Sequence, residues 1–561
     1  MNEISDIGAV RTLVRQLHQR GISDIVLSPG SRNAPFILSF NAVDSFHCQS
    51  ILDERTAGFV ALGIAQQKGR PAVLSCTSGS AVLNYAPALV EAYYQKVPLI
   101  AITADRPAAW IDQGEGQSIR QVGLLDKVVV SAFDLVEEQN ETDRWYNHRL
   151  VNEALETAMK TSRPVQINVP LSEPLYGMAP TNMEDVPSFA FTNLKRSIQE
   201  EDLGRMTVEW EGAKRIAILA TDGAGVEGLQ EGLTRFHDDS RIAIITETNA
   251  NLYHLGYISC IDRTIECFIG SEWEEEYIPD LLITIGGNVI SKKLKALFRR
   301  HKEKLTHHWH FGTEVMDTFQ SLTRLIDAGP RAVFGQLEPM VSVAGEGFGT
   351  RWKARFFEVE QKHAAFLETC PYSDLKVFEH LLDTLPEGSV LQMGNSSVVR
   401  YVQLFNQIRN IRYFGNRGVS GIEGCTSTAV GAAQASDALT VLVSGDQAFR
   451  YDSNALAVKE GIEKMRIIVI NNGGGNIFRI IDGPSRHEAS EAFIEKKDEA
   501  SIAKLVGYHG VDYLSASNLA ELDQALGDLF AVERNGVAVL EVFTPRIESP
   551  EILKSYFKAL R

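Results

Sequence analysis

Ser-Gly-Asp-Gln at residues 444–447 and Asn-Asn-Gly-Gly-Gly-Asn-Ile-Phe at residues 471–478 each follow a mainly apolar run of strand length. Asn472 lies 26 residues after Asp446, which is enough for one crossover helix between parallel strands. The carboxyl ends of parallel strands meet at one edge, where ligands bind in open α/β sheets, so we expect the two side chains to lie together. Their oxygens and a free backbone carbonyl at Gly474 are hard ligands, which predicts a Mg²⁺ ion holding a diphosphate.

This arrangement resembles the metal–diphosphate motif of thiamine-diphosphate (ThDP) enzymes. The usual opening of that motif is Gly-Asp-Gly, and this chain has Gly445-Asp446-Gln447. The third residue is not a metal ligand, so the departure is tolerable. On this motif alone, two ordinary strand-end turns of an α/β domain remain an open alternative.

The composition is that of a globular protein, and 561 residues are too many for one hydrophobic core, so about three domains are expected. No apolar run approaches the ~20 residues needed to span a bilayer, and residues 1–6 are too polar for a signal peptide, so no membrane insertion is expected.

The net charge of -17 argues against nucleic acid as a partner. The 6 scattered cysteines are typical of reduced thiols in a cytoplasmic protein.

Strand-like runs alternate with helical stretches along the whole chain, which predicts an α/β fold with doubly wound parallel sheets. Proline-containing residues 174–187 and Gly-rich residues 345–349 are candidate linkers. We therefore expect three domains at 1–185, 190–360 and 370–561. The expected strands are 24–28, 72–75, 99–103, 165–169, 216–220, 242–246, 281–285, 390–393, 439–444, 467–470 and 537–542.

A carboxylic acid, Glu54, stands at the start of a small-residue helix within Asp53-Glu54-Arg55. ThDP chemistry needs one acid beside atom N1′ of the aminopyrimidine, because that bond favours the tautomer that removes the C2 proton of the thiazolium. Glu54 is the candidate for this role and should then be buried. A solvated acid favoured by the helix dipole is the alternative.

Three further turns follow strands of the first domain. Residues 28–33 (Ser-Pro-Gly-Ser-Arg-Asn) offer backbone N–H groups and the guanidinium of Arg32 to an anion. Residues 77–80 contain Gly79, which permits close approach to a flat ring, and residues 103–107 carry Arg106. Taken singly, each turn is also what an ordinary helix cap requires.

Taken together and in order, these motifs resemble the ThDP-dependent transferases of menaquinone biosynthesis. The resemblance covers both outer domains, and the middle domain contributes little to it. It is carried by the turns above, Ile-Asp-Gln-Gly-Glu-Gly-Gln at 111–117, Gly-Asn-Ser at 394–396 and Asn-Arg-Gly-Val-Ser-Gly-Ile-Glu-Gly at 416–424.

The resemblance implies that 2-oxoglutarate is decarboxylated on ThDP and that the succinyl carbanion adds to isochorismate. The first domain then binds the pyrimidine, the last binds the diphosphate through Mg²⁺ (or Mn²⁺), and the middle domain is a nucleotide-type α/β unit. In this superfamily the acid and the metal site come from different subunits. A homodimer at least, and plausibly a homotetramer, is therefore expected.

The same resemblance implies roles for a wider set of residues. The expected carboxylate-binding cations are Arg32, Arg106, Arg400 and Arg417, with Lys292 or Lys293 from the middle domain. The expected neutral donors are Ser31, Gln117 and Ser396. The expected cofactor contacts are Pro29, Glu54, Thr77, Gly79, Asn395, Ser420, Ile422 under the thiazolium, Gly445, Asp446, Gln447, Ile477 and Phe478. The expected metal ligands are Asp446, Asn472 and the carbonyl of Gly474.

Two positions depart from the family pattern. Gly116 stands where an Asn is common, so one side-chain hydrogen bond near the substrate is missing or replaced. Lys293 stands where an Arg is common, which keeps the charge and loses the planar fork. Both departures bear on substrate affinity more than on reaction class.

The middle domain carries a competing motif, the GxGxxG at residues 223–228, with Glu247 at the end of the next strand. It leaves open a dinucleotide-dependent oxidoreductase or a FAD-carrying relative. Asp222 places a negative charge beside any pyrophosphate, which favours a structural loop. Another ThDP-dependent 2-oxoacid decarboxylase or synthase, and a cofactor-binding scaffold without turnover, also remain open.

Overall fold

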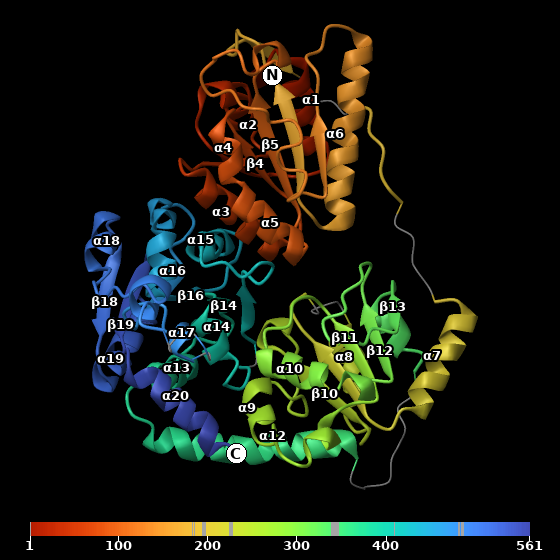
Figure 1. Ribbon diagram of the computed structural model, residues 1–561. Helices are drawn as coiled ribbons and strands as arrows, with labels where there is room; N and C mark the ends of the chain where they lie inside the picture. Colours follow the sequence, from red (N-terminus) through yellow and green to blue (C-terminus); the bar gives the residue numbers. More distant parts are fainter. Residues whose placement is uncertain are drawn as a thin grey trace.

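The computed structural model describes residues 2–181, 183, 186–192, 198–223, 228–337, 347–408, 410–480, 483 and 487–561. Three parallel sheets covered by helices follow one another along the chain (Figure 1). The α/β class and the three doubly wound sheets are thus confirmed. All the expected strands are present, with ends that shift by at most two residues.

The first domain contains a parallel sheet in the order β3-β2-β4-β5-β7-β6 and a small antiparallel pair, β1 with β8. Its strands are β1 (Asn2–Ser5), β2 (Asp24–Leu27), β3 (His47–Ser50), β4 (Ala72–Cys76), β5 (Leu99–Asp105), β6 (Ser131–Asp134), β7 (Val165–Pro170) and β8 (Met178–Thr181). Its helices are α1 (Gly8–Gln19), α2 (Ala34–Asn41), α3 (Glu54–Lys68), α4 (Ser80–Asn84), α5 (Ala86–Gln95) and α6 (Glu141–Thr161).

The middle domain has a sheet in the order β10-β9-β11-β12-β13. Its strands are β9 (Ile216–Ala220), β10 (Ile242–Thr246), β11 (Leu281–Ile285), β12 (His307–Phe311) and β13 (Arg324–Ile326). Its helices are α7 (Glu200–Gly212), α8 (Leu229–Thr234), α9 (Ile261–Glu266), α10 (Lys292–Arg300), α11 (Pro330–Phe334) and α12 (Phe348–Thr369).

The third domain repeats the strand order of the first, as β15-β14-β16-β17-β19-β18. Its strands are β14 (Val390–Met393), β15 (Arg412–Gly415), β16 (Thr440–Gly445), β17 (Met465–Asn471), β18 (Asp512–Ala516) and β19 (Ala538–Phe543). Its helices are α13 (Asp374–Asp383), α14 (Ser397–Val402), α15 (Cys425–Gln434), α16 (Asp446–Tyr451), α17 (Ile477–Ile480), α18 (Ala503–Tyr508), α19 (Leu519–Leu529) and α20 (Glu548–Ala559). In both outer sheets the strand order reverses between the first and third strands, which is where open α/β sheets bind ligands.

Helix α3 is built to be buried on all sides. The carboxylate of Asp53 caps it by accepting the N–H groups of Arg55 and Thr56, and the left-handed Gly69 (φ 62°) ends it. All residues from 56 to 65 are buried. A helix that is small and apolar all round needs partners on several faces.

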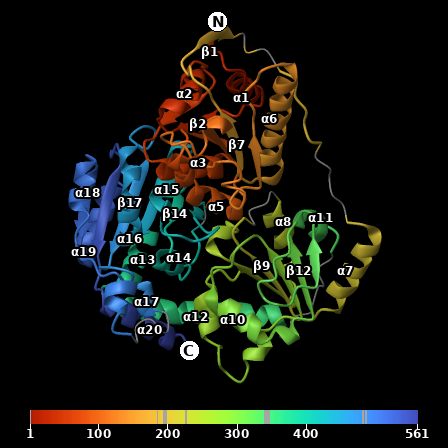
Figure 2. The ribbon, with the colours of Figure 1, turned by 45° about the horizontal axis from the view of Figure 1, so that its top comes forward.

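Helix α15 of the third domain is the main partner of α3, and the two helices share one hydrophobic core (Figures 1 and 2). A Cβ at Gly63 would lie 2.0 Å from the carbonyl oxygen of Thr428, and one at Gly431 would lie 1.9 Å from that of Val60. Glycine at both positions therefore lets the two backbones touch. The first and third domains are joined through this crossing.

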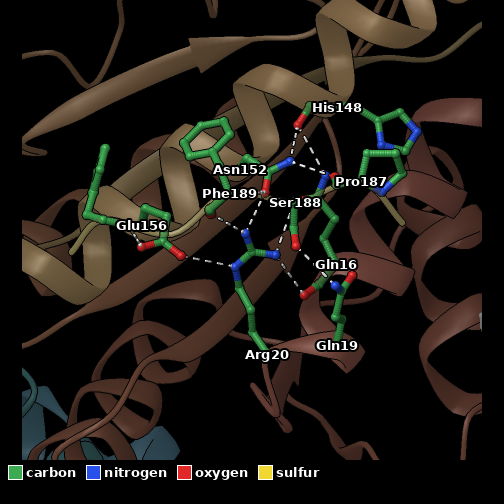
Figure 3. A network of polar contacts seen from close by, with 10 residues as sticks. Gln16, Gln19, Arg20, His148, Asn152, Glu156, Pro187, Ser188 and Phe189 are labelled. Carbon is green, nitrogen blue, oxygen red and sulfur yellow. Dashed lines mark hydrogen bonds and ion pairs between the residues drawn. The ribbon is translucent and has the colours of Figure 1, made fainter. Parts of the chain in front are cut away.

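The segment that leaves the first domain is tied to its surface (Figure 3). Arg20 pairs with Glu156 at 3.5 Å, and Asn152 donates to the carbonyl of Pro187 at 3.2 Å. The N–H of Phe191 donates to Glu156 at 3.0 Å. Contacts of the first domain thus continue past the expected boundary at 185.

The expected boundary between 360 and 370 falls inside one continuous helix, α12. Its first half packs in the middle-domain core through Phe348 and Trp352, and its second half packs in the third-domain core through Val359 and Leu367. The Gly-rich linker expected at 345–349 lies partly outside the described residues. Within the described ranges, none of the helices has the length and apolar character needed to cross a bilayer.

Candidate active site

The carboxyl edge of the third sheet brings the predicted metal ligands together. Gly445 pairs with Ile470, so Asp446 and Asn472 come directly after adjacent strand ends. Asp446 is only 2% exposed, and its Oδ2 has no hydrogen-bond partner among the described residues. Burial raises the pKa of Asp446 to about 7, although Arg450 opposes the shift. A buried carboxylate oxygen without a partner is costly, and a cation would satisfy it.

The side-chain amide of Asn472 is oriented by a second buried acid. Its Nδ2 donates to Oδ2 of Asp374 at 2.9 Å, which leaves Oδ1 as the free acceptor. Thr544 donates to Oδ1 of the same carboxylate at 2.5 Å. Asp374 thus fixes which atom Asn472 presents, as partners behind a metal ligand commonly do.

Gly474 completes an oxygen set that suits a hard divalent cation. Its φ of 140° lies in the region that favours glycine, and a Cβ there would lie 3.0 Å from the carbonyl oxygen of Glu495. Its own carbonyl accepts the N–H of Asn476 at 2.9 Å and retains a second lone pair. No three His, Cys, Asp or Glu side chains cluster as a metal site in the described part of the chain. One carboxylate, one amide and one backbone carbonyl therefore form the candidate ligand set.

Asp374→Asn is expected to raise the dissociation constant for Mg²⁺ by about 10–100-fold, because an amide can present an N–H group to Asn472 and turn its oxygen away. Titrating the protein–ThDP mixture with Mg²⁺ in a calorimeter measures this constant. Thr544→Val is the matched control, since it removes the other hydrogen bond to Asp374 and leaves Asn472 untouched. An unchanged constant in Asp374→Asn would remove this carboxylate from the support of the metal site.

A segment that the sequence did not single out covers the metal motif. The amide of Gln447 donates to the carbonyls of Glu495 at 2.7 Å and Lys496 at 2.8 Å, and Gly475 N–H donates to the former at 2.7 Å. Gln447 was expected to contact the cofactor, but its Nε2 is occupied by this segment. Ile477 and Phe478 begin α17 and are half-buried beside it.

The predicted acid, Glu54, stands at the start of α3, at the edge of the first sheet. It accepts a hydrogen bond from Asn84 at 3.2 Å. Its neighbours reach the third domain: Arg55 donates to the carbonyl of Tyr451 at 2.8 Å, and Asn454 donates to Asp53 at 2.7 Å. Glu54 is half-buried in the single chain, not buried as expected.

The turns after β2 and β4 meet at the reversal point of the first sheet. A Cβ at Gly30 would lie 2.4 Å from Cβ of Thr77, so this turn needs glycine for its close approach. The hydroxyls of Thr77 and Ser78 are buried and have no partner among the described residues. Gly79 (φ 90°) lies against the exposed Gln117, whose backbone is 3.2 Å from the position of a Cβ. These hydroxyls are free to bind a ligand.

Pro29 and Ser31 also lie in this turn and are exposed. The hydroxyl of Ser31 is 3.3 Å from that of Tyr176. Both residues are therefore accessible to a bound molecule at the same sheet edge.

Arg32 and Arg106 form a first pair of cations. Arg32 is buried, donates to the carbonyl of Leu171 and pairs with Glu173 at 3.3 Å. Burial lowers the pKa of Arg32, and the charge of Arg106 lowers it further. Arg106 donates to the carbonyl of Gly116 at 3.1 Å. Gly116, which stands where the family commonly has an Asn, therefore contributes a backbone acceptor.

Arg400 follows β14 and Arg417 follows the neighbouring strand β15, and the two form a second pair of cations at the carboxyl edge of the third sheet. Arg417 is buried and donates to Oδ1 of Asn395 at 2.7 Å. Burial lowers the pKa of Arg417, and Arg400 lowers it further. Ser396 (φ 73°) and Ser420 (φ 65°) both hold left-handed conformations beside them. Strained backbone of this kind is common at functional sites.

Ile422 follows this loop just before α15. Its side chain is 38% exposed although its neighbours in α15 are buried. An apolar side chain presented in this way is available to support a bound ring.

Of the two expected lysines, Lys293 is engaged outside this cluster. Lys293 pairs with Glu266 and lies 3.3 Å from the ring centre of Phe557, while Lys292 is exposed. Lys295 is the lysine that interacts with the charges of Arg400 and Arg417, and its Nζ donates to the carbonyl of Val289 at 2.8 Å. Burial lowers its pKa, Glu247 opposes this, and Arg400 and Arg417 lower it further. Side chains at 293 and 295 point to different faces of a helix, and packing against α20 selects the face.

The competing motif of the middle domain falls largely on residues 224–227, which lie outside the described residues. Glu247 is fully buried, and its Oε1 accepts the N–H groups of Ile290 at 2.7 Å and Ser291 at 2.9 Å. Burial raises its pKa to about 8. This carboxylate holds the start of α10 and is not presented at an open strand end.

Comparisons with known proteins give matches for both outer domains and for the whole chain. Residues 8–124 match the family described as "Thiamine pyrophosphate enzyme, N-terminal TPP binding domain", and residues 393–542 match "Thiamine pyrophosphate enzyme, C-terminal TPP binding domain". The chain is 38% identical over 559 residues to the 2-succinyl-5-enolpyruvyl-6-hydroxy-3-cyclohexene-1-carboxylate synthase of Flavobacterium johnsoniae, covering 99% of both chains. The synthases of the same name from Porphyromonas gingivalis and Bacteroides thetaiotaomicron are 37% and 34% identical to it, each over 99% of this chain and, respectively, 98% and 99% of the relative.

Proposed function

The chain belongs to the 2-succinyl-5-enolpyruvyl-6-hydroxy-3-cyclohexene-1-carboxylate synthase family of ThDP-dependent transferases, and we propose that it decarboxylates 2-oxoglutarate and joins the succinyl unit to isochorismate in menaquinone biosynthesis. The observation that carries this substrate choice is a set of arginines with buried N–H donors that are unused within the described part of the chain. Arg106, Arg400 and Arg417 each keep an Nε–H that is buried and has no partner among the described residues. Both substrates are multiply anionic, so their carboxylates satisfy these donors.

Asp446, Asn472 and the Gly474 carbonyl hold a Mg²⁺ ion (or Mn²⁺) in this proposal. The ion fits because the ligands are hard oxygens and one of them is a buried carboxylate oxygen that no described residue contacts through a hydrogen bond. The metal in turn neutralises the diphosphate of ThDP. Bound ThDP supplies the electron-deficient ring that accepts the electron pair released on decarboxylation.

The protein's own contribution is proton transfer, binding and orientation. Glu54 would donate a hydrogen bond to N1′ of the aminopyrimidine, and Ile422 would offer its exposed apolar side chain to the cofactor. Arg32 with Arg106, and Arg400 with Arg417 and Lys295, bind carboxylates and hold them against the global negative charge of the chain. Ser31, Gln117 and Ser396 add neutral donors.

The active unit of this proposal is a homodimer at least, and plausibly a homotetramer. It is supported by the half-exposed state of Glu54, an acid that must be desolvated to act. A partner subunit supplies the missing cover. All the cysteines are free thiols, which supports a reducing, cytoplasmic location.

Product analysis with 2-oxoglutarate, with and without isochorismate, tests the proposed function. We expect slow release of CO₂ with 2-oxoglutarate alone and the coupled product when both are present. Rapid decarboxylation at a rate that does not depend on isochorismate would indicate a simple decarboxylase of the same superfamily. Binding of NAD(H), seen by titration, points to an oxidoreductase that uses the middle domain.

A further inference from the structure

The loop at residues 416–421 carries Arg417 and Ser420 but has no regular secondary structure of its own. It connects β15 to α15 and leads directly into Ile422. A loop of this kind is flexible unless its backbone groups are bonded elsewhere. Its hydrogen bonds come from all three domains.

The first domain holds the loop through one buried acid, Glu91 of α5, which is 1% exposed. Its Oε1 accepts the N–H of Gly418 at 2.5 Å, and its Oε2 accepts that of Val419 at 2.8 Å. A Cβ at Gly418 would lie 2.5 Å from the carbonyl oxygen of Glu91, so glycine is required for this approach. Gln95 supports the arrangement by donating to Oε1 of Glu91 at 2.6 Å.

The middle domain holds the other side of the same peptide units. Nδ2 of Asn288, in the turn after β11, donates to the carbonyls of Arg417 at 2.8 Å and Gly418 at 2.7 Å. The third domain adds Asn395, whose Nδ2 donates to the carbonyls of Asn416 at 2.7 Å and Gly421 at 2.6 Å. Backbone donors and acceptors of the loop are therefore satisfied from three directions.

Glu91 also affects the pKa of Arg417, the charged side chain of the loop. It is among the acids that raise the pKa of Arg417, against the larger effect of burial. The guanidinium donates to Asn395, and its buried Nε–H has no partner within the ranges that the structure describes. The contacts thus fix the backbone of Arg417 and leave part of its donor set for a ligand.

We infer that Glu91 and Asn288 are positioning residues, which hold residues 416–421 so that Arg417 meets a substrate carboxylate. The middle domain then takes part in substrate binding through this hold on the loop. The part of the inference that concerns substrate binding rests on the proposed function. The fixing of residues 416–421 by Glu91 and Asn288 is a property of the chain and can be measured without substrate.

The test combines hydrogen–deuterium exchange of the 416–421 peptide with kinetics on the full-length protein. Glu91→Gln replaces one of two acceptor oxygens, and Asn288→Ala removes both donations to the loop. Each variant should exchange faster in this peptide and raise KM for one anionic substrate about tenfold or more, while the Kd for ThDP with Mg²⁺ changes much less because the metal ligands are untouched. Asn288 is exposed, so its variant should fold even where Glu91→Gln does not.

Glu156→Gln is the matched control, because this acid also accepts a backbone N–H from a distant segment, that of Phe191, and contacts the first domain rather than the loop. It should leave exchange at 416–421 and both KM values unchanged. Unchanged exchange in both loop variants overturns the inference, as does faster exchange with unchanged KM. If the wild type turns over neither substrate, the proposed function falls and the exchange result alone decides whether the loop is held.

Discussion

Glu54→Gln is expected to lower the turnover number by about 10²–10⁴-fold, the usual contribution of a positioned acid or base. The amide keeps the size of the side chain and can still accept the hydrogen bond from Asn84, so the fold is retained. It cannot share an acidic proton with the aminopyrimidine. Steady-state turnover and exchange of the C2 proton of bound ThDP, followed by NMR, measure the two consequences separately.

The matched control for this variant is Glu141→Gln, which makes the same change at the exposed start of another helix, α6. It should leave turnover and C2 exchange as in the wild type. A Glu54→Gln enzyme that keeps most of its activity would remove Glu54 from the chemistry. Because ThDP binding rests chiefly on the metal site, its affinity should change far less than turnover.

The second large effect is expected from two buried acids at the ends of α16. Asp446 has an oxygen without a partner in the described part of the chain, whereas Asp452 accepts from both the N–H and the hydroxyl of Ser427, at 2.7 and 2.8 Å. Asp446→Asn should weaken Mg²⁺-dependent ThDP binding at least about 100-fold and leave the melting temperature of the cofactor-free protein unchanged or higher. Asp452→Asn should lower the free energy of unfolding by about 1–3 kcal/mol and change the affinity for ThDP little.

A calorimetric ThDP titration gives the affinity of each variant, and thermal unfolding gives the melting temperature of each. The crossed pattern separates a residue that serves a ligand from one that serves the fold. Equal losses of stability in the two variants, with equal affinities, would place Asp446 among the structural acids.

The central strands of the two outer sheets could be predicted because they are mainly apolar runs buried on both faces, whereas β12, an inner strand of the middle sheet that reads His-His-Trp-His-Phe, was missed. The strands that escaped prediction in the outer sheets are β3, β6, β15 and β18, which lie at the sheet edges. β3, for example, reads His-Cys-Gln-Ser and is partly exposed throughout. An edge strand has one neighbour and a mixed environment, so its sequence carries little periodic signal.

The site could be predicted where it depends on local geometry, and not where it depends on packing between domains. Asp446 and Asn472 follow strands directly, so parallel pairing alone brings them together. The choice of Lys295 over Lys293 depends on how α10 is rotated against α20, which no local pattern records. The sequence offers one indication that Glu91 is special, because it is the acid in the otherwise small and apolar stretch 86–92. Its hydrogen-bond partners in the loop, however, lie more than 300 residues away.

Asp374 illustrates the same limit. It begins α13 far ahead of the metal motif, and its contact with Asn472 joins residues separated by 98 positions. Residues that support a ligand from behind follow no spacing rule, because any element that packs there can supply them. They emerge only from the folded arrangement.

Titration of the purified protein with ThDP in a calorimeter, once with Mg²⁺ and once with a chelator, is the most direct test of the metal–diphosphate site. The account predicts saturable binding with Mg²⁺ that weakens at least about 100-fold when the metal is removed. ThDP binding of equal strength in both titrations, or no binding in either, would contradict it.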